Sequence, residues 1–179
     1  MSRFLYYGAS ANLSHINPNY YSPELRDPDP TTTNCVSCSI ATDVSLAGIP
    51  VVASEFMFSD IWLICEIYGR DFEDILIEKD YENEIKNISV DASDYILQEK
   101  IKEFILMKMN ELKSIFEVAG NQSRGIVVVG TTDNKPCHAF NICNMGDVGV
   151  QFMDGQNNKI VIGFSEKTNY IGYIRTGFI

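Results

Sequence analysis

A cysteine, a histidine and a carboxylate occupy positions in this chain where a folded domain could bring them together for nucleophilic chemistry. Cys35 follows a helix-start signal, His138 opens an apolar run typical of a strand, and Asp154 ends the next such run. A helix N-terminus favours the thiolate form of a cysteine, and an imidazole can accept or hold the proton. A carboxylate fixes the orientation and tautomer of that imidazole. These residue types in this order predict a thiol nucleophile served by a His-Asp pair.

Two cysteines three positions apart compete for the nucleophile's role. With Asn34 as N-cap, Cys35 is the first helical residue, where the free backbone N–H groups and the helix dipole act most strongly. Cys38 lies one turn further along on nearly the same face and would then be a buried packing residue. We favour Cys35, and a later helix start would exchange the two roles.

Other interpretations of these residues use the same sequence signals. The Cys35–Cys38 spacing also occurs in zinc sites, but four ligands are normally needed, and the other three cysteines are scattered without a second pair. A thioredoxin-like redox pair would need a preceding βαβ pattern, which is absent. His138 could be a hydrogen-bonded core histidine, and the sequence Asp-Gly-Gln-Asn from Asp154 alone indicates an ordinary turn. Spacing leaves the His-Asp pair open; we predict no metal site and no cofactor.

Composition limits the classes of protein and partner. The chain has 179 residues, of which 45% are hydrophobic and 21% charged, which fits one domain with a hydrophobic core. A net charge of -10 argues against nucleic acid as a partner, and suits either a basic protein surface or solubility alone. No apolar run reaches the length of a membrane span, and no signal peptide is recognisable at the N-terminus. Without that signal, the five cysteines are expected to be mostly reduced, and export would need a route that leaves no N-terminal signal.

Helix signals dominate the first two thirds of the chain, and strand signals dominate the rest. Helices are predicted over 35–47, 60–69 and 93–119, each followed closely by glycine, whereas the acidic stretch 70–92 is ambiguous. Strands are predicted over 125–130, 138–144, 148–153, 159–164 and 170–174. We therefore expect an α+β domain over residues 34–179, with N-terminal helices packed on a C-terminal antiparallel sheet. The Pro- and Asn-rich residues 1–33 are expected to form an extended arm.

Several segments in this order resemble the papain-fold toxin family of bacterial polymorphic toxin systems, whose members are predicted glutamine deamidases. The matching segments are 34–43 (NCVSCSIATD), 46–50 (LAGIP), 123–127 (SRGIV), 138–141 (HAFN) and 152–156 (FMDGQ). Before the histidine this chain has Cys137, where the family usually carries glycine. The resemblance implies a papain-like fold and a Cys-His-Asp triad at Cys35, His138 and Asp154.

The resemblance also implies a toxin or effector, often the C-terminal part of a longer secreted protein, that is delivered into a target cell. On this basis we expect a thiol amidohydrolase that acts on a glutamine of a target-cell protein, and a cognate immunity protein as a further partner. The Cys35 N–H and the Asn34 amide are the candidate oxyanion donors, and Gln156 is a candidate cleft residue. Papain-like proteolysis and transglutamination share the acyl-enzyme step, so the sequence does not separate them from deamidation. A non-catalytic papain-fold binding module is the alternative outside enzyme chemistry.

Overall fold

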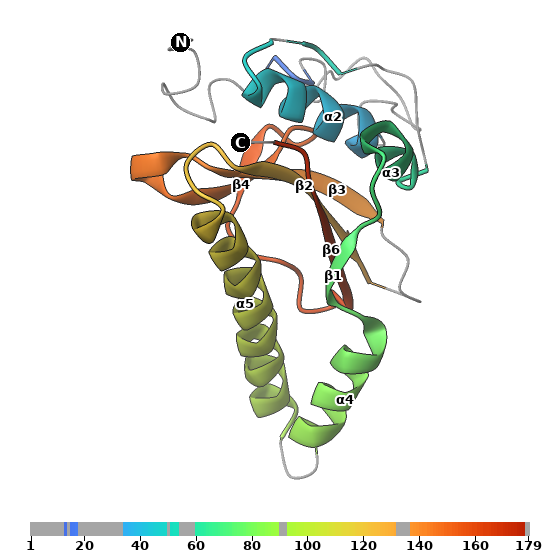
Figure 1. Ribbon diagram of the computed structural model, residues 1–179. Coiled ribbons are helices and arrows are strands. Elements are labelled where there is room, and N and C mark those ends of the chain that lie inside the picture. Colours follow the sequence, from blue (N-terminus) through green and yellow to red (C-terminus); the bar gives the residue numbers. More distant parts are fainter. Residues whose placement is uncertain are drawn as a thin grey trace, which may run out of the picture.

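The residues of interest lie in a domain of three layers, in which one sheet is packed between helices. The computed structural model describes residues 13, 15–17, 34–49, 51–53, 60–89, 93–131 and 137–177. In this part of the chain one sheet has α2 and α3 on one face and α5 on the other, with α4 beside α5 (Figure 1). The elements are, in order, α2 (Cys35–Leu46), α3 (Leu63–Tyr68), β1 (Glu73–Leu76), α4 (Glu78–Ser89), α5 (Asp94–Val118), β2 (Arg124–Gly130), β3 (His138–Asn144), the 3-10 helix η3 (Gly146–Val148), β4 (Val150–Asp154), β5 (Lys159–Val161) and β6 (Tyr170–Arg175).

The sheet has six strands in the order β1-β6-β2-β3-β4-β5, and every pairing is antiparallel. The expected α+β architecture, with helices first and an antiparallel sheet last, is therefore confirmed. β3 is a central strand, paired with β2 on one side and β4 on the other. In antiparallel neighbours the start of one strand lies near the end of the next, so this order brings the start of β3 near the end of β4.

Side chains that alternate along the strands build two separate cores. On one face, Val127 and Phe140 pack with the buried stripe of α5, which consists of Ile105, Met109, Leu112 and Phe116 at helical spacing. On the other face, Ile126 and Val128 pack with Val36 of α2. Both faces of the sheet are thus covered, and α2 is held rigidly against the central strands.

The helix ends agree closely with their sequence signals. α2 ends one residue before the predicted Ala47, and α5 covers the predicted 93–119 except for one residue at each end. Gly48, Gly69 and Gly120 follow α2, α3 and α5 with positive φ, the conformation that glycine adopts without steric cost. The segment 70–92 resolves into β1, a four-residue edge strand, and α4, a helix in which no residue is buried.

Most of the predicted arm, residues 1–33, lies outside the described residues. The exceptions are Leu13 and residues 15–17, which pack on the domain. Leu13 and Ile16 are buried in a third core with Cys38 and Met153. The second helix, predicted over 60–69, is α3 and begins only at Leu63, after turn residues 61 and 62.

Candidate active site

Cys35 is the first residue of α2, with its side chain partly exposed. The Asn34 carbonyl accepts the first helical hydrogen bond from the Cys38 N–H, at 2.9 Å. Asn34 occupies the N-cap position as predicted, but its side chain makes no capping bond to the helix. Its backbone (φ -101°, ψ 32°) departs from the extended conformation usual for a capping residue, and its fully buried side chain lies 3.5 Å from the Asn17 amide instead.

His138 and Asp154 lie together at the end of the central hairpins. Pairing of β3 with β4 places Asn141 opposite Met153, so Asp154 at the end of β4 is a diagonal neighbour of His138 at the start of β3. The His138 Nε2 lies 2.9 Å from an Asp154 carboxylate oxygen, and Cys35 is near enough to the imidazole to help raise the pKa of His138. Since Nε2 faces the carboxylate, Nδ1 is the nitrogen available to the thiol. The structure thus pairs His138 with Asp154 and places Cys35 within the range of their electrostatic interactions.

Asn157 is a further polar partner of the carboxylate, which the sequence interpretation did not identify. Its backbone N–H donates to Asp154 Oδ1 at 3.1 Å, and its side-chain amide donates to Oδ2. The carboxylate, only 2% exposed, is therefore held from two sides. The Asp-Gly-Gln-Asn signal for a turn was the available clue, because aspartate in a turn often accepts from a backbone N–H shortly after it.

Burial and pairing act in opposite directions on the pKa values of His138 and Asp154. Burial alone would lower the pKa of His138, but hydrogen bonds and charges from Asp154 and Cys35 outweigh burial and raise that pKa to about 9. Burial would raise the pKa of Asp154, but its bonds to His138 and Asn157 hold that pKa below its usual range. At neutral pH the pair is therefore a carboxylate and an imidazolium, and the imidazolium lies next to a sulfur.

This pairing predicts a specific pH dependence of stability. Since the pKa of His138 is about 9 in the folded state against 6.5 for the free side chain, its stabilisation is fully present below pH 6.5 and is lost as pH rises through 9. We expect the free energy of unfolding, measured with urea, to fall over this window in the wild type. In His138→Ala this part of the fall should disappear. Parallel stability curves for the two proteins would contradict the pairing.

Cys38 is in a different environment from Cys35. It is 1% exposed and packs with Ile16 and Met153, and burial, followed by the charges of Asp154 and Cys35, raises the pKa of its thiol to about 12. Burial likewise raises the pKa of Cys143 to about 11. All five cysteines are free thiols.

We therefore expect Cys35 to react faster with iodoacetamide near neutral pH than either buried cysteine, because alkylation requires an accessible thiolate. Peptide mapping after brief treatment with limiting reagent measures the order of labelling. Faster labelling of Cys38 than of Cys35 would transfer the nucleophile's role to Cys38.

The predicted cleft residue Gln156 is buried, and its backbone carbonyl accepts a hydrogen bond from the Asn17 side-chain amide at 3.1 Å.

Among the described residues, no group of three or more His, Cys, Asp and Glu side chains could hold a metal ion. None of the helices in the described ranges is long and apolar enough to cross a membrane.

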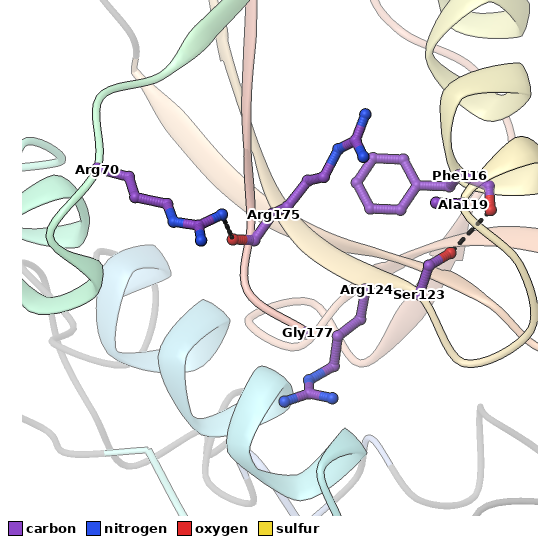
Figure 2. A pocket seen from close by; sticks show the side chains of 7 residues that line it. All are labelled: Arg70, Phe116, Ala119, Ser123, Arg124, Arg175 and Gly177. Carbon is purple, nitrogen blue, oxygen red and sulfur yellow. Dashed lines mark hydrogen bonds between the residues drawn. The ribbon is translucent and has the colours of Figure 1, made fainter. Parts of the chain in front are cut away.

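A second buried polar cluster fixes the other end of α2. Asp43, in its last turns, accepts hydrogen bonds from Arg124 Nε at 3.0 Å, from the Tyr68 hydroxyl at 2.8 Å and from the Thr176 hydroxyl. Arg124 also lines a pocket of about 280 Å³, in which its side chain turns away from Arg70 and Arg175 toward α2 (Figure 2). Arg124 begins β2, whereas the partner of His138 is Val129 near the end of that strand. The pocket therefore lies away from the triad, and we regard the cluster as an anchor for α2.

Comparisons with known proteins assign most of the chain to a family. A family model described as papain fold toxin 1, glutamine deamidase, matches residues 33–159, a range that contains Cys35, His138 and Asp154. A solved structure described as the G161 variant of the Salmonella effector SpvD aligns with a TM-score of 0.45 and 14% sequence identity, covering 100% of this chain and 80% of that one. No curated protein matches the sequence significantly.

Proposed function

Since this chain belongs to the papain fold toxin 1, glutamine deamidase family, we propose that it is a toxin or effector that deamidates a glutamine of a target protein. The observation that supports the proposal is the position of His138, which hydrogen-bonds with Asp154 and interacts electrostatically with Cys35 at a helix N-terminus. Within the family-matched range, this is the arrangement that covalent thiol catalysis needs.

The proposed reaction has two halves. In the first, the Cys35 thiolate attacks the carboxamide carbon of the substrate, and the carbonyl oxygen becomes an oxyanion. The Cys35 N–H, with the Asn34 amide, is the proposed donor set for that oxyanion. The imidazolium of His138 gives its proton to the departing nitrogen, ammonia leaves, and a thioester on Cys35 remains.

In the second half, neutral His138 takes a proton from water, and the water oxygen attacks the thioester carbon. Collapse of the tetrahedral intermediate breaks the C–S bond, releases glutamate and returns the thiolate beside the imidazolium. Throughout the cycle Asp154 keeps His138 in the tautomer that presents Nδ1 to the sulfur. Apart from the substrate, water is the one reactant that the two halves consume.

Such chemistry suits a toxin because a single event changes the charge of the target. Deamidation converts a neutral glutamine into a glutamate, and an unpaired charge at a buried or functional site is costly. We propose delivery into a target-cell cytosol, a protein substrate there and a cognate immunity protein as a second partner. Residues 34–179 are the proposed catalytic domain.

Mass spectrometry of proteins from a susceptible cell tests the activity. After incubation with the protein, we expect glutamine-to-glutamate conversion at one or a few positions, and no conversion with Cys35→Ala. New chain termini would indicate a protease, and glutamine cross-links a transglutaminase. No covalent change in any target, together with stable complex formation, would favour the binding module.

A further inference from the structure

Residues 15–17 form a short clip across α2 and the turn that follows Asp154. Ile16 is buried against α2, and its carbonyl accepts from the Ala53 N–H at 2.8 Å. At one end of the clip, His15 Nε2 lies 3.5 Å from the Ser45 hydroxyl near the end of α2. At the other end, Asn17 reaches the beginning of α2. The clip lies outside the range matched by the family model, which begins at residue 33.

Asn17 contacts both sides of the proposed triad. Its side-chain amide, in a residue only 4% exposed, donates to the Gln156 carbonyl at 3.1 Å and lies 3.5 Å from Asn34 Oδ1. Its backbone carbonyl accepts from the Asn158 side-chain amide at 3.2 Å. The same residue therefore touches the position before the nucleophile and, twice, the turn after the carboxylate.

The turn after Asp154 is packed too closely to shift without disturbing these contacts. A Cβ on Gly155 would lie 2.2 Å from the Thr42 hydroxyl oxygen and 3.0 Å from Ile16, so only glycine lets the turn approach α2 and the clip. From this turn Asn157 donates both of its bonds to the Asp154 carboxylate. The position of the turn therefore sets the position of the carboxylate.

These contacts join into a closed ring. Starting from Asn17, the ring passes to the turn at 156–158, to Asp154, to His138 and to Cys35, and returns through Asn34. The link between His138 and Cys35 is an electrostatic interaction, and every other link is a hydrogen bond or a covalent neighbour. Asn17 is the only member contributed by residues 15–17. Removing it opens the ring between the nucleophile's helix and the turn that holds the carboxylate.

We propose that Asn17 is a positioning residue that fixes the separation of Cys35 from the His138–Asp154 pair, an inference that rests on the proposed function of this site. It acts through Asn34 and the 156–158 turn and does not touch the substrate carbonyl. A small displacement of a nucleophile lowers the rate by a large factor. Loss of Asn17 should therefore reduce turnover more than substrate binding.

The test compares Asn17→Leu and Asn17→Ala with His15→Ala in the full chain. Leucine nearly keeps the size of asparagine and adds no charge, but it cannot donate to Gln156 or Asn34. His15→Ala is the matched control, because it alters the same clip at the end remote from the triad. The measurements are kcat and KM for deamidation and, separately, the rate of Cys35 alkylation as a function of pH, with melting temperature as the check on folding.

We expect both Asn17 variants to lose roughly 10- to 100-fold in kcat while KM stays nearly unchanged. Their Cys35 alkylation profile should move relative to wild type, because the thiol no longer keeps its place beside His138. His15→Ala should match wild type in both measurements. If one Asn17 variant fails to fold, the other decides.

Wild-type kinetics in Asn17→Leu, or an equal loss in His15→Ala, would overturn the positioning role. The alkylation profile keeps this result separate from the proposed function. If the wild-type protein deamidates nothing but Asn17→Leu still shifts the Cys35 profile, the function fails and the positioning role stands. If the wild type is active and the Cys35 alkylation profile of Asn17→Leu equals that of the wild type, only the positioning role fails.

Discussion

Cytosolic expression of the Cys35→Ala variant is expected to leave susceptible cells growing, whereas the wild type should kill them. Removing the sulfur removes the atom that forms the thioester, and loss of the nucleophile alone costs a factor on the order of 10⁶ in other covalent hydrolases. Cys35 is partly exposed and packs against the core around Val36 without being one of its buried members, so alanine there should leave the fold intact. Growth curves at matched expression levels measure the effect.

Cys38→Ala is the matched control, one helical turn away. Its thiol is buried and carries a raised pKa, so its replacement should cost about 1 kcal/mol of stability but leave toxicity in place. If wild type and Cys35→Ala are equally toxic, either Cys38 is the nucleophile or the protein harms the cell by binding a target without chemistry. The double variant Cys35→Ala, Cys38→Ala separates these, since toxicity that persists there would favour the binding module.

Asp154→Asn is expected to lower turnover by roughly 10⁴, the loss seen when the carboxylate of a Ser-His-Asp triad becomes an amide. The surrounding bonds give the reason. The Asn157 N–H donates to Oδ1, whereas the Asn157 side-chain amide and His138 Nε2 both lie against Oδ2. An amide has a single oxygen acceptor, so in either orientation its NH2 group faces a donor, and the negative charge that stabilises the imidazolium is lost.

The same variant should shift the pH profile of activity. Without the carboxylate, the strongest influence that raises the pKa of His138 is gone, so the pKa should fall toward its usual range. Asp147→Asn, an identical change on an exposed residue of η3, should leave turnover and the pH profile unchanged. Near-normal turnover in Asp154→Asn would remove Asp154 from the triad.

Much of the fold could be predicted from local signals, because they agree with the tertiary structure. The apolar stripe of α5 and the glycines after α2 and α5 act within one element, and the helices they predict are found within a residue or two. The family and its papain-like α+β fold, predicted from five short segments, are confirmed by the family match. β1 and α4 could not be assigned, because an edge strand of four residues and a helix with no buried side chain leave almost no periodic apolar pattern.

The candidate site could be predicted only as far as its contacts follow strand order. The pairing of β3 with β4 brings His138 to Asp154, a pair that the spacing in the sequence had left open. Asn157 was missed because its turn signal does not reveal which group the turn supports. Asn17 was missed because its contacts span 17 residues to Asn34 and 139 to Gln156, and no local pattern encodes them. The catalytic roles of Cys35, His138 and Asp154 stay predictions.

The most direct test of the account compares the fraction of Cys35 that is alkylated with the deamidase activity that remains. Samples are taken during slow treatment with iodoacetamide, and labelling of each cysteine is measured by peptide mapping. Activity is measured on an unmodified protein that the wild type deamidates. If Cys35 forms the thioester, the remaining activity should fall in proportion to unlabelled Cys35 and reach zero when Cys35 is fully modified, with Cys38 still unlabelled. Deamidation that continues after Cys35 is completely modified would contradict the account.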